Sequence, residues 1–251
     1  MTEHMDIKEF KTENHENERH FWEIAKTAFV LTMIRKYRGK FSSALDIGCG
    51  DCYVISQIAA NFPEVNCTGA DPALTPKLIG FFRKKLSERG LDVEILNKIP
   101  DKEFDAVFMF DVLEHLKDDR GHLKNLPQLK PGGILFITVP AFQCLFSGHD
   151  EFLEHYRRYN RRQLLETVAA SGLQILESGY FFCSLLPLRW LQKISRKKYS
   201  ADTVAPVAVA VINRLLAFCL QADAAFGYFM KKLKIQIPGL SCYVICQKPL
   251  S

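Results

Sequence analysis

Two glycines and one aspartate stand at a spacing that suits a nucleotide-like ligand. Gly48 and Gly50 follow a short apolar run and precede a helical stretch, and Asp71 comes 21 residues after Gly50. Glycine lets the backbone turn sharply and approach a ligand, and the helix beyond it offers free N–H groups. An acid at the end of the next strand accepts hydrogen bonds from ribose hydroxyls. A dinucleotide or S-adenosylmethionine would fit, but the dinucleotide pattern G-x-G-x-x-G fails because Tyr53 takes the place of its third glycine.

Histidine and arginine gather in a second polar segment, residues 146–159. Imidazole titrates near neutral pH, so His149 or His155 could take a proton from a substrate. The alternative is that His155 and Arg157 only pair with acids and hold the segment on the domain. His149 and His155 are therefore the candidate catalytic residues, and the purely structural role stays open.

Asp111, Glu114 and His115 offer three ligands for a divalent ion within one helical turn. Such an ion would bind a substrate hydroxyl and lower its pKa. We favour the alternative, in which Glu114 and His115 only order the segment, and we predict no bound metal. Cys49 and Cys52 have redox spacing, but they lie inside the glycine loop and lack a second cysteine pair at zinc-site distance, so we expect them to be bystanders.

The elements that must position these residues follow from the apolar periodicity of the chain. Helices are predicted over residues 21–37, 53–62, 74–89 and 161–170. Strands are predicted over 44–48, 66–70, 93–96, 106–110, 134–139, 175–182 and 242–247. Such alternation predicts an α/β fold with a parallel sheet. Ligands bind such sheets beyond the carboxyl ends of the strands, where the residues above would meet.

Four stretches, in this order, resemble the motifs of class I S-adenosylmethionine-dependent methyltransferases. They are Asp46-Ile47-Gly48-Cys49-Gly50, Gly69-Ala70-Asp71-Pro72, the segment 104–115, and Leu129-Lys130-Pro131-Gly132-Gly133. The resemblance implies a Rossmann-like, mostly parallel sheet whose last strand is antiparallel, with a helical insertion before that strand. Residues 1–182 and 241–251 would form the cofactor-binding domain with an N-terminal helix, and residues 183–240 the insertion.

The resemblance also implies which residues bind S-adenosylmethionine. They would be Asp46, Gly48, Gly50, Asp71, Pro72, Asn97, Phe110 and Asp111. The glycines would make room for the methionine part, which Asp46 would contact unless it only orders the loop. Asp71 would hold the ribose hydroxyls, and Asn97 would meet the adenine. The segment 146–159 resembles a His-Asp…His-x-Arg-Arg-Tyr stretch of a bacterial subgroup of the family.

Charge is concentrated in the expected insertion. The chain has 251 residues and a net charge of +5, with 48% hydrophobic and 24% charged residues, which suits one globular domain with an insertion and excludes disorder. Residues 183–240 carry nine basic side chains against Asp202 and Asp223, a net charge of +7 that leaves −2 for the remainder. Basic residues beside apolar surface suit an anionic lipid surface.

A long helix is predicted over residues 207–233, within this insertion. Its polar edge consists of Asn213, Arg214, Gln221, Lys231 and Lys232, and most of its remaining circumference is apolar. The helix could pack on the domain as a lid, lie on a membrane or pair with a second subunit. We favour the packed lid, with its polar edge in solvent.

Together these patterns predict a methyltransferase that acts on a small-molecule or lipid-linked acceptor, with oxygen as the expected atom. Nucleic acid is a weaker candidate partner, because the chain has no aromatic–glycine RNA-binding signature. Two alternatives stay open: a non-catalytic cofactor-binding module docked to a membrane or partner, and an RNA methyltransferase. No secretory signal or membrane-spanning apolar run is visible, so we expect a cytoplasmic protein with peripheral membrane contact. The oligomeric state is left open.

Overall fold

The fold is organised around one seven-stranded sheet. The computed structural model describes residues 19–37, 39–194 and 210–250. The strands lie in the order β3-β2-β1-β4-β5-β7-β6. Their bounds are β1 Ser43–Ile47, β2 Asn66–Ala70, β3 Val93–Leu96, β4 Phe104–Phe110, β5 Leu129–Pro140, β6 Gln174–Phe181 and β7 Ser241–Gln247. Strands β1 to β5 pair in parallel, and β7 pairs antiparallel with both β5 and β6. The predicted sheet is therefore confirmed, including its antiparallel last strand.

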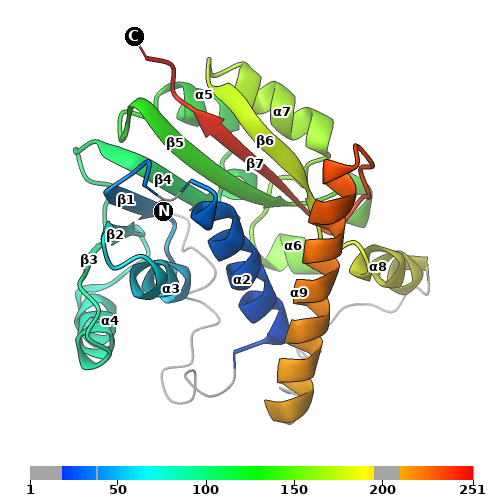
Figure 1. Cartoon of the computed structure of the whole chain (residues 1–251), viewed down its shortest axis with the longest axis horizontal. Helices are drawn as coiled ribbons and strands as arrows, with labels where there is room; N and C mark the ends of the chain where they lie inside the picture. The colour runs from blue at the N-terminus through cyan, green and yellow to red at the C-terminus, as the bar shows by residue number, and fades with distance from the viewer. Residues whose placement is uncertain (1–18, 38, 195–209, 251) are drawn as a thin grey trace.

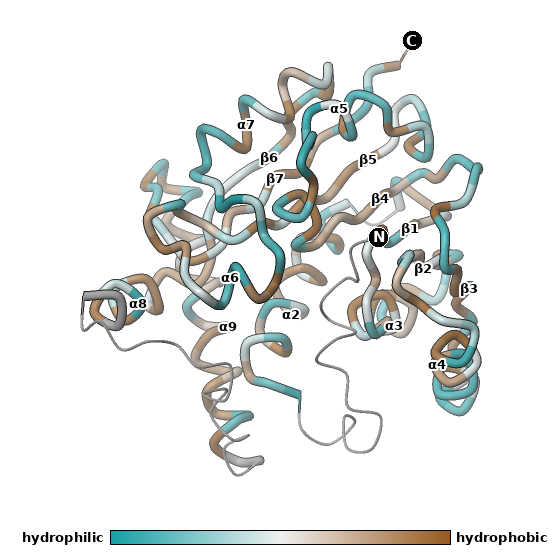
Figure 2. Tube along the Cα trace, turned by 180° about the vertical axis from the view of Figure 1, so that it is seen from behind, coloured by the Kyte–Doolittle hydropathy of each residue, from teal (hydrophilic) through white to brown (hydrophobic). Residues whose placement is uncertain are grey.

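Helices cover both faces of this sheet (Figure 1). One face carries α2 (Phe21–Arg35), α3 (Tyr53–Asn61) and α9 (Ala210–Lys232), and the other α5 (Asp119–Lys124) and α7 (Arg161–Ala169). Helix α4 (Pro76–Glu88) packs beside β3. Each face has its own apolar core, and the central strands β4 and β5 contribute to both. Figure 2 shows these strands largely in hydrophobic brown, whereas α7 alternates between hydrophilic teal and hydrophobic brown, as expected for a helix with one solvent face.

The sheet brings the candidate residues to one edge. Parallel strands β1 and β4 are neighbours, but the chain leaves them in opposite directions, so the crevice at their carboxyl ends is the topological switch point. The glycine loop follows β1 and Asp71 follows β2. Asp111 follows β4, and the segment 146–159 lies beyond β5. Candidate site residues that are far apart in sequence therefore share this edge.

Short helices were not predicted from periodicity. The chain forms α6 (Gly148–Phe152), α8 (Leu185–Ile194) and the 3-10 turns η1 (Leu113–His115) and η2 (Gln143–Leu145). Helix α6 lies within the segment 146–159, where no helix was predicted. It begins with a capping box between Ser147 and Asp150, a local device that needs no apolar repeat. Strand β5 begins at Leu129, earlier than the predicted start at residue 134, and its first part, with Pro131, pairs irregularly with β4.

The long helix α9 lies between β6 and β7 in the chain and packs on α2 and β6. The prediction of a solvent-facing polar edge is wrong at two positions: Asn213 is buried, and Lys231 donates to Glu177 and to the Tyr243 hydroxyl. Residues 195–209, with Asp202 and the first part of the expected helix, lie outside the described residues. Among the helices that the structure does describe, none combines the length and apolarity needed to cross a membrane.

Candidate functional site

The glycine loop between β1 and α3 has a backbone that requires glycine. Gly48 and Gly50 have φ values of +75° and +51°, in the left-handed region. A Cβ added to Gly48 would lie 2.8 Å from Cγ2 of Val112, so even alanine would collide with the chain that leaves β4. The Gly48 N–H donates to the carbonyl of Ala70 at 2.8 Å, which fixes the loop on β2. The loop is therefore a tight backbone cradle at the switch point of the sheet.

Asp71 ties this cradle to the end of β2. Its side chain is almost fully buried, Oδ2 accepts from the Gly50 N–H at 3.1 Å, and Oδ1 accepts from the Ala73 N–H at 2.9 Å. A carboxylate has about four lone-pair sites, so both oxygens can accept further hydrogen bonds from a ligand. Asp46 is buried within β1, which favours the loop-ordering role of the two that were expected for it.

The remaining expected cofactor residues lie along the same strand ends. Pro72 and Asn97 are exposed after β2 and β3, and Phe110 is half-buried at the end of β4, where its ring stacks on Phe108 at 5.5 Å. This arrangement offers a ligand both polar and aromatic contacts. The structure places all eight expected cofactor residues at or directly behind the edge where the cradle lies.

Asp111 links the end of β4 to α2. It has φ of +55° although it is not glycine, a strained conformation of the kind found at functional sites. Oδ1 accepts from the Thr138 hydroxyl at 2.9 Å, and Oδ2 pairs with the ammonium of Lys26. Burial alone would raise the pKa of Asp111, but the Lys26 charge holds it below its ordinary value. Asp111 is therefore a carboxylate near neutral pH, and Lys26, which no motif indicated, keeps it so.

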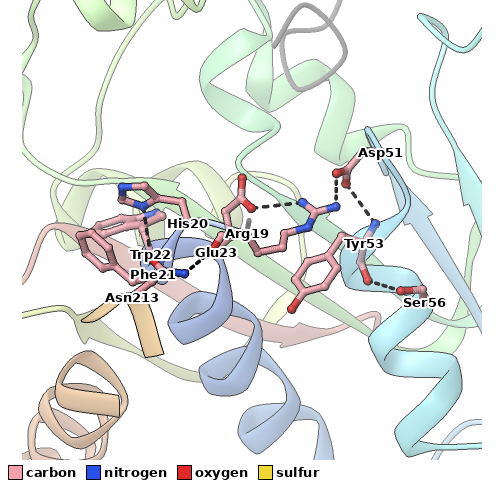
Figure 3. A network of polar contacts seen from close by, with 9 residues as sticks. All are labelled: Arg19, His20, Phe21, Trp22, Glu23, Asp51, Tyr53, Ser56 and Asn213. Atoms are coloured by element: carbon pink, nitrogen blue, oxygen red, sulfur yellow. Dashed lines mark hydrogen bonds and ion pairs between the residues drawn. The ribbon is translucent and has the colours of Figure 1, made fainter. Parts of the chain in front are cut away.

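A second network, drawn in Figure 3, joins the start of α2 to the glycine loop. The Arg19 guanidinium pairs with Asp51, donates to Glu23 at 3.1 Å and lies 4.0 Å from the centre of the Tyr53 ring. Asp51 also accepts from the Tyr53 N–H at 3.1 Å, at the start of α3. Sequence reasoning missed Arg19, because a basic residue in a polar lead carries no periodic or motif signal.

Asp150 and His155 form a buried hydrogen-bonded pair beyond β5. The atoms His155 Nδ1 and Asp150 Oδ1 are 2.9 Å apart, and Arg158 Nε donates to the same oxygen at 2.7 Å. Asp150 is fully buried, which alone would raise its pKa, yet hydrogen bonds from His155 and Arg158 hold the pKa well below its ordinary value. An ionised Asp150 favours a proton on Nδ1 of His155 and leaves Nε2 as the proton acceptor.

His149 occupies a different setting. It is half-buried in the first turn of α6, and burial lowers its pKa, so its imidazole is neutral at pH 7. The His155 ring, by contrast, lies against the His115 ring, with ring centres 4.7 Å apart. These two histidines and Glu114 form a group of possible metal ligands. Of the two candidate catalytic histidines, His155 therefore combines a hydrogen bond to a buried carboxylate with a ring contact to a second histidine.

Glu114 is the most unusual carboxyl of the site. It is fully buried, and within the described ranges neither of its oxygens has a hydrogen-bond partner. Burial, with the nearby Asp111 charge, raises its pKa well above the ordinary value. One candidate ligand atom from each of Glu114, His115 and His155 lies within 4.8 Å of the others. The group of possible metal ligands therefore consists of Glu114, His115 and His155, whereas the sequence indicated Asp111 as its third member. The absence of a bound metal stays a prediction.

The segment 146–159 is also held in place structurally. The Tyr156 N–H donates to the carbonyl of Glu114 at 2.8 Å, Arg157 pairs with Asp119 at 3.2 Å, and the Tyr159 hydroxyl donates to Asp119 at 2.6 Å. The alternative reading of the sequence therefore holds for Arg157, which fastens the segment to α5. The same contacts fix His155 above the end of β4.

Comparison with known proteins gives a consistent family. A sequence model described as a methyltransferase domain matches residues 16–178, more than half of the chain. A probable S-adenosylmethionine-dependent methyltransferase of Mycolicibacterium smegmatis is 27% identical over 134 residues, 52% of this chain and 51% of that protein. A ubiquinone biosynthesis O-methyltransferase of Coxiella burnetii is 26% identical over 159 residues, 55% of this chain and 66% of that protein.

Solved structures share the fold. Coclaurine N-methyltransferase, bound to N-methylheliamine and S-adenosylhomocysteine, matches with a TM-score of 0.58 and 17% identity over 95% of this chain and 76% of that one. The cyclase SpnF matches with a TM-score of 0.58 and 21% identity over 95% of this chain and 86% of that one. At these identities the likeness shows the fold alone. This chain spans between 51% and 66% of the length of the curated relatives that it matches, with about half for the first two.

Proposed function

The chain belongs to the methyltransferase domain family, and we propose that it is an S-adenosylmethionine-dependent methyltransferase that methylates an oxygen of a small-molecule or lipid-linked acceptor. One observation supports this most directly. The glycine cradle, tied by Asp71 to β2, opens at the same sheet edge as the buried Asp150–His155 pair. The candidate cofactor site and the candidate base therefore share one edge of the sheet.

The cradle fits the cofactor that the family implies. Gly48 leaves no room for a side chain, which suits a ligand that meets the backbone closely. Asp71 would accept from the ribose hydroxyls, Asn97 would meet the adenine and Phe110 would cover the ligand, while Pro72 shapes the turn after β2. S-adenosylmethionine, when bound, supplies an electrophilic methyl group on a positively charged sulfonium. Asp46 would order the loop, and the carboxylate of Asp111 would sit beside that charge.

The chain's own contribution is alignment, exclusion of water and removal of one proton. A hydroxyl that gains a methyl group must lose its proton. Nε2 of His155 would accept this proton, because the hydrogen bond to Asp150 keeps the ring's other proton on Nδ1. Asp150 then stabilises the imidazolium, since its lowered pKa keeps it negative. His149 is the second candidate for this role, because its imidazole is neutral at pH 7.

Oxygen is favoured as the acceptor atom for two reasons. A hydroxyl needs a base, and the site has a histidine oriented by a buried carboxylate. The Coxiella burnetii relative is named as an O-methyltransferase of ubiquinone biosynthesis. The exposed apolar side chains of α8 and α9 suit an acceptor with a hydrophobic or lipid part. We expect the enzyme to act in the cytoplasm, with peripheral contact to an anionic membrane.

Two other functions are distinguishable by experiment. An RNA methyltransferase would use the basic insertion to bind phosphates, whereas the exposed face of α9 is chiefly apolar. A non-catalytic module would bind the cofactor without turnover, and the likeness of the cyclase SpnF shows that this fold alone does not specify methyl transfer.

The test is a screen of cell extracts, separated into lipid, small-molecule and RNA fractions, with the cofactor labelled on its methyl group. We expect label in the small-molecule or lipid fraction with the wild-type protein and strongly reduced label with His155→Ala. Label in RNA would favour the RNA enzyme. Cofactor binding without label in any fraction would favour the non-catalytic module.

A further inference from the structure

The side of α9 that faces away from the domain is an apolar strip. Its members are exposed and recur three or four residues apart: Leu215, Phe218, Ala222, Phe226 and Phe229. This spacing places them on one side of the helix, along about 21 Å of its axis. The side that packs on α2 and β6 instead carries Asn213, Ala217, Leu220 and Ala224, all buried. We call the exposed strip the outward face of α9.

Apolar exposure is concentrated in this part of the molecule. Of the sixteen large hydrophobic residues that are exposed among the described residues, eleven lie between Leu185 and Ile235. Helix α8 contributes Leu188, Trp190 and Leu191, each more than half exposed. The start of α8 is tied to α9, because the Ser184 N–H donates to Asp223 at 2.9 Å. Apolar surface gathered in this way marks an interaction site.

Basic residues border the outward face. Arg214 and Lys232 are both exposed and stand 18 residues apart, which is five full turns, so they mark the same border near the two ends of the strip. Lys234 is exposed just beyond the helix. Asp223 is the one acidic residue in the described part of the insertion, and it is half-buried. An apolar strip with a cationic border matches a membrane interface that carries anionic headgroups.

A second copy of the chain would fit this face less well. In a two-fold contact between antiparallel helices, the cation near one end of the strip meets the cation near the other end of the second helix. RNA would require phosphate contacts along the strip, where the side chains are apolar. An anionic bilayer matches both the apolar strip and its cationic border. The phenylalanines would enter the acyl-chain region, and the border cations would pair with the headgroups.

We propose that the outward face of α9, together with the exposed side chains of α8, docks on an anionic lipid surface. The docking itself is independent of chemistry, but its consequence, access to a lipid-linked acceptor, rests on the proposed function. Trp190 provides a direct probe, because the chain has only two tryptophans and the other, Trp22, packs on Phe182 with ring centres 4.3 Å apart. Trp190 is 53% exposed and would enter the interface.

The experiment adds phosphatidylglycerol or phosphatidylcholine vesicles to the full chain at low and high salt. We expect co-sedimentation with phosphatidylglycerol at low salt and about tenfold weaker binding at high salt. Tryptophan emission should shift to the blue in Trp22→Phe but not in Trp190→Phe. The triple variant Phe218→Ser, Phe226→Ser, Phe229→Ser should bind at least about tenfold more weakly. Leu250→Ser removes an 82% exposed leucine outside the insertion and should bind like the wild type.

Three results would overturn the proposal: no binding at low salt, unchanged binding by the triple variant, or a lipid-free dimer that the triple variant converts to a monomer. Cofactor binding by the triple variant, measured by calorimetry, verifies that it is folded. The outcomes for the two proposals separate cleanly. Vesicle binding without turnover on any acceptor would reject the proposed function alone, and turnover without vesicle binding would reject the docking alone.

Discussion

Asn213 on α9 and Arg19 before α2 are joined by a hydrogen bond that spans 194 residues of sequence. Nδ2 of Asn213 donates to the Arg19 carbonyl, and Oδ1 accepts from the Phe21 N–H at 2.8 Å (Figure 3). The Arg19 side chain in turn pairs with Asp51 in the glycine loop. The buried amide of Asn213 therefore holds the segment whose Arg19 side chain pairs with the glycine loop.

Asn213→Ala should lower both stability and cofactor affinity. The change leaves the Phe21 N–H and the Arg19 carbonyl without their partner, which costs about 1–3 kcal/mol in the free energy of unfolding. Denaturant titration measures this cost, and calorimetry measures the affinity for S-adenosylhomocysteine. Arg214→Ala, at the exposed neighbouring position, is the control and should change neither. Equal effects of the two substitutions would show that the amide has no special role.

Gly48→Ala should destabilise the fold more than Gly90→Ala. Both glycines have positive φ, +75° and +67°, so both substitutions incur the backbone penalty of about 1 kcal/mol. At Gly48 the new Cβ would also lie 2.8 Å from Val112, whereas nothing lies within 4 Å at Gly90. Thermal unfolding of Gly48→Ala, Gly90→Ala, Val112→Ala and the double variant Gly48→Ala, Val112→Ala tests this. The double variant should lose less stability than the sum of the losses in Gly48→Ala and Val112→Ala.

Asp71→Ala should weaken binding of S-adenosylmethionine and S-adenosylhomocysteine by about 1–3 kcal/mol, because charge-assisted hydrogen bonds are lost. The loop should loosen as well, since the N–H groups of Gly50 and Ala73 lose their acceptor. Calorimetry on wild type and variant measures the difference. The cofactor assignment fails if the wild-type protein binds neither ligand, or if it prefers NAD.

His155→Ala should reduce kcat by about 10²–10⁴ and change cofactor affinity little, because in the proposed function the imidazole takes the acceptor's proton. Asp150→Asn should shift the pH profile of kcat, since the amide cannot stabilise an imidazolium as the carboxylate does. His149→Ala tests the second candidate in parallel. Wild-type rates in both alanine variants would show that neither histidine is the base.

Chelation should leave turnover nearly unchanged, in keeping with the expectation that no metal takes part. Dialysis against EDTA, followed by assay with and without added Mg²⁺, measures this. Activity that is lost in EDTA and restored by Mg²⁺ would assign an ion to Glu114, His115 and His155, whose candidate ligand atoms lie within 4.8 Å of one another.

Glu114→Gln should stabilise the protein at neutral pH. Because the pKa of Glu114 is raised in the folded state, the folded protein keeps a proton that the unfolded chain releases above about pH 4.3. The free energy of unfolding of the wild type therefore falls as pH rises from about 4.3 toward the folded-state pKa. Glutamine has no such proton to lose, and its advantage should vanish below that pH. Denaturant titrations from about pH 4 to about pH 8 test the sign. A variant that is less stable at neutral pH would reveal a native partner for the carboxylate.

The sequence by itself determined the sheet and the glycine loop. An apolar run ended by glycines predicted β1, and the run closed by Asp71-Pro72 predicted β2, so Gly48, Gly50 and Asp71 were placed at the ends of two predicted strands. These features are local in the chain, because strand periodicity and positive-φ turns depend on neighbouring residues. For the same reason the loop could be assigned before its contacts were known.

Only the tertiary structure decided which side of α9 faces the domain. A helical wheel separates polar from apolar positions but does not say which side meets the sheet, and the usual rule puts the polar side in solvent. Here Asn213 and Lys231 found buried partners on the domain, and this turned Phe218 and Phe226 outward. The approach of the His155 ring to His115, and the isolation of Glu114, likewise depend on where β4 and β5 end beside each other. Such contacts arise between distant segments, so the order of residues does not encode them locally.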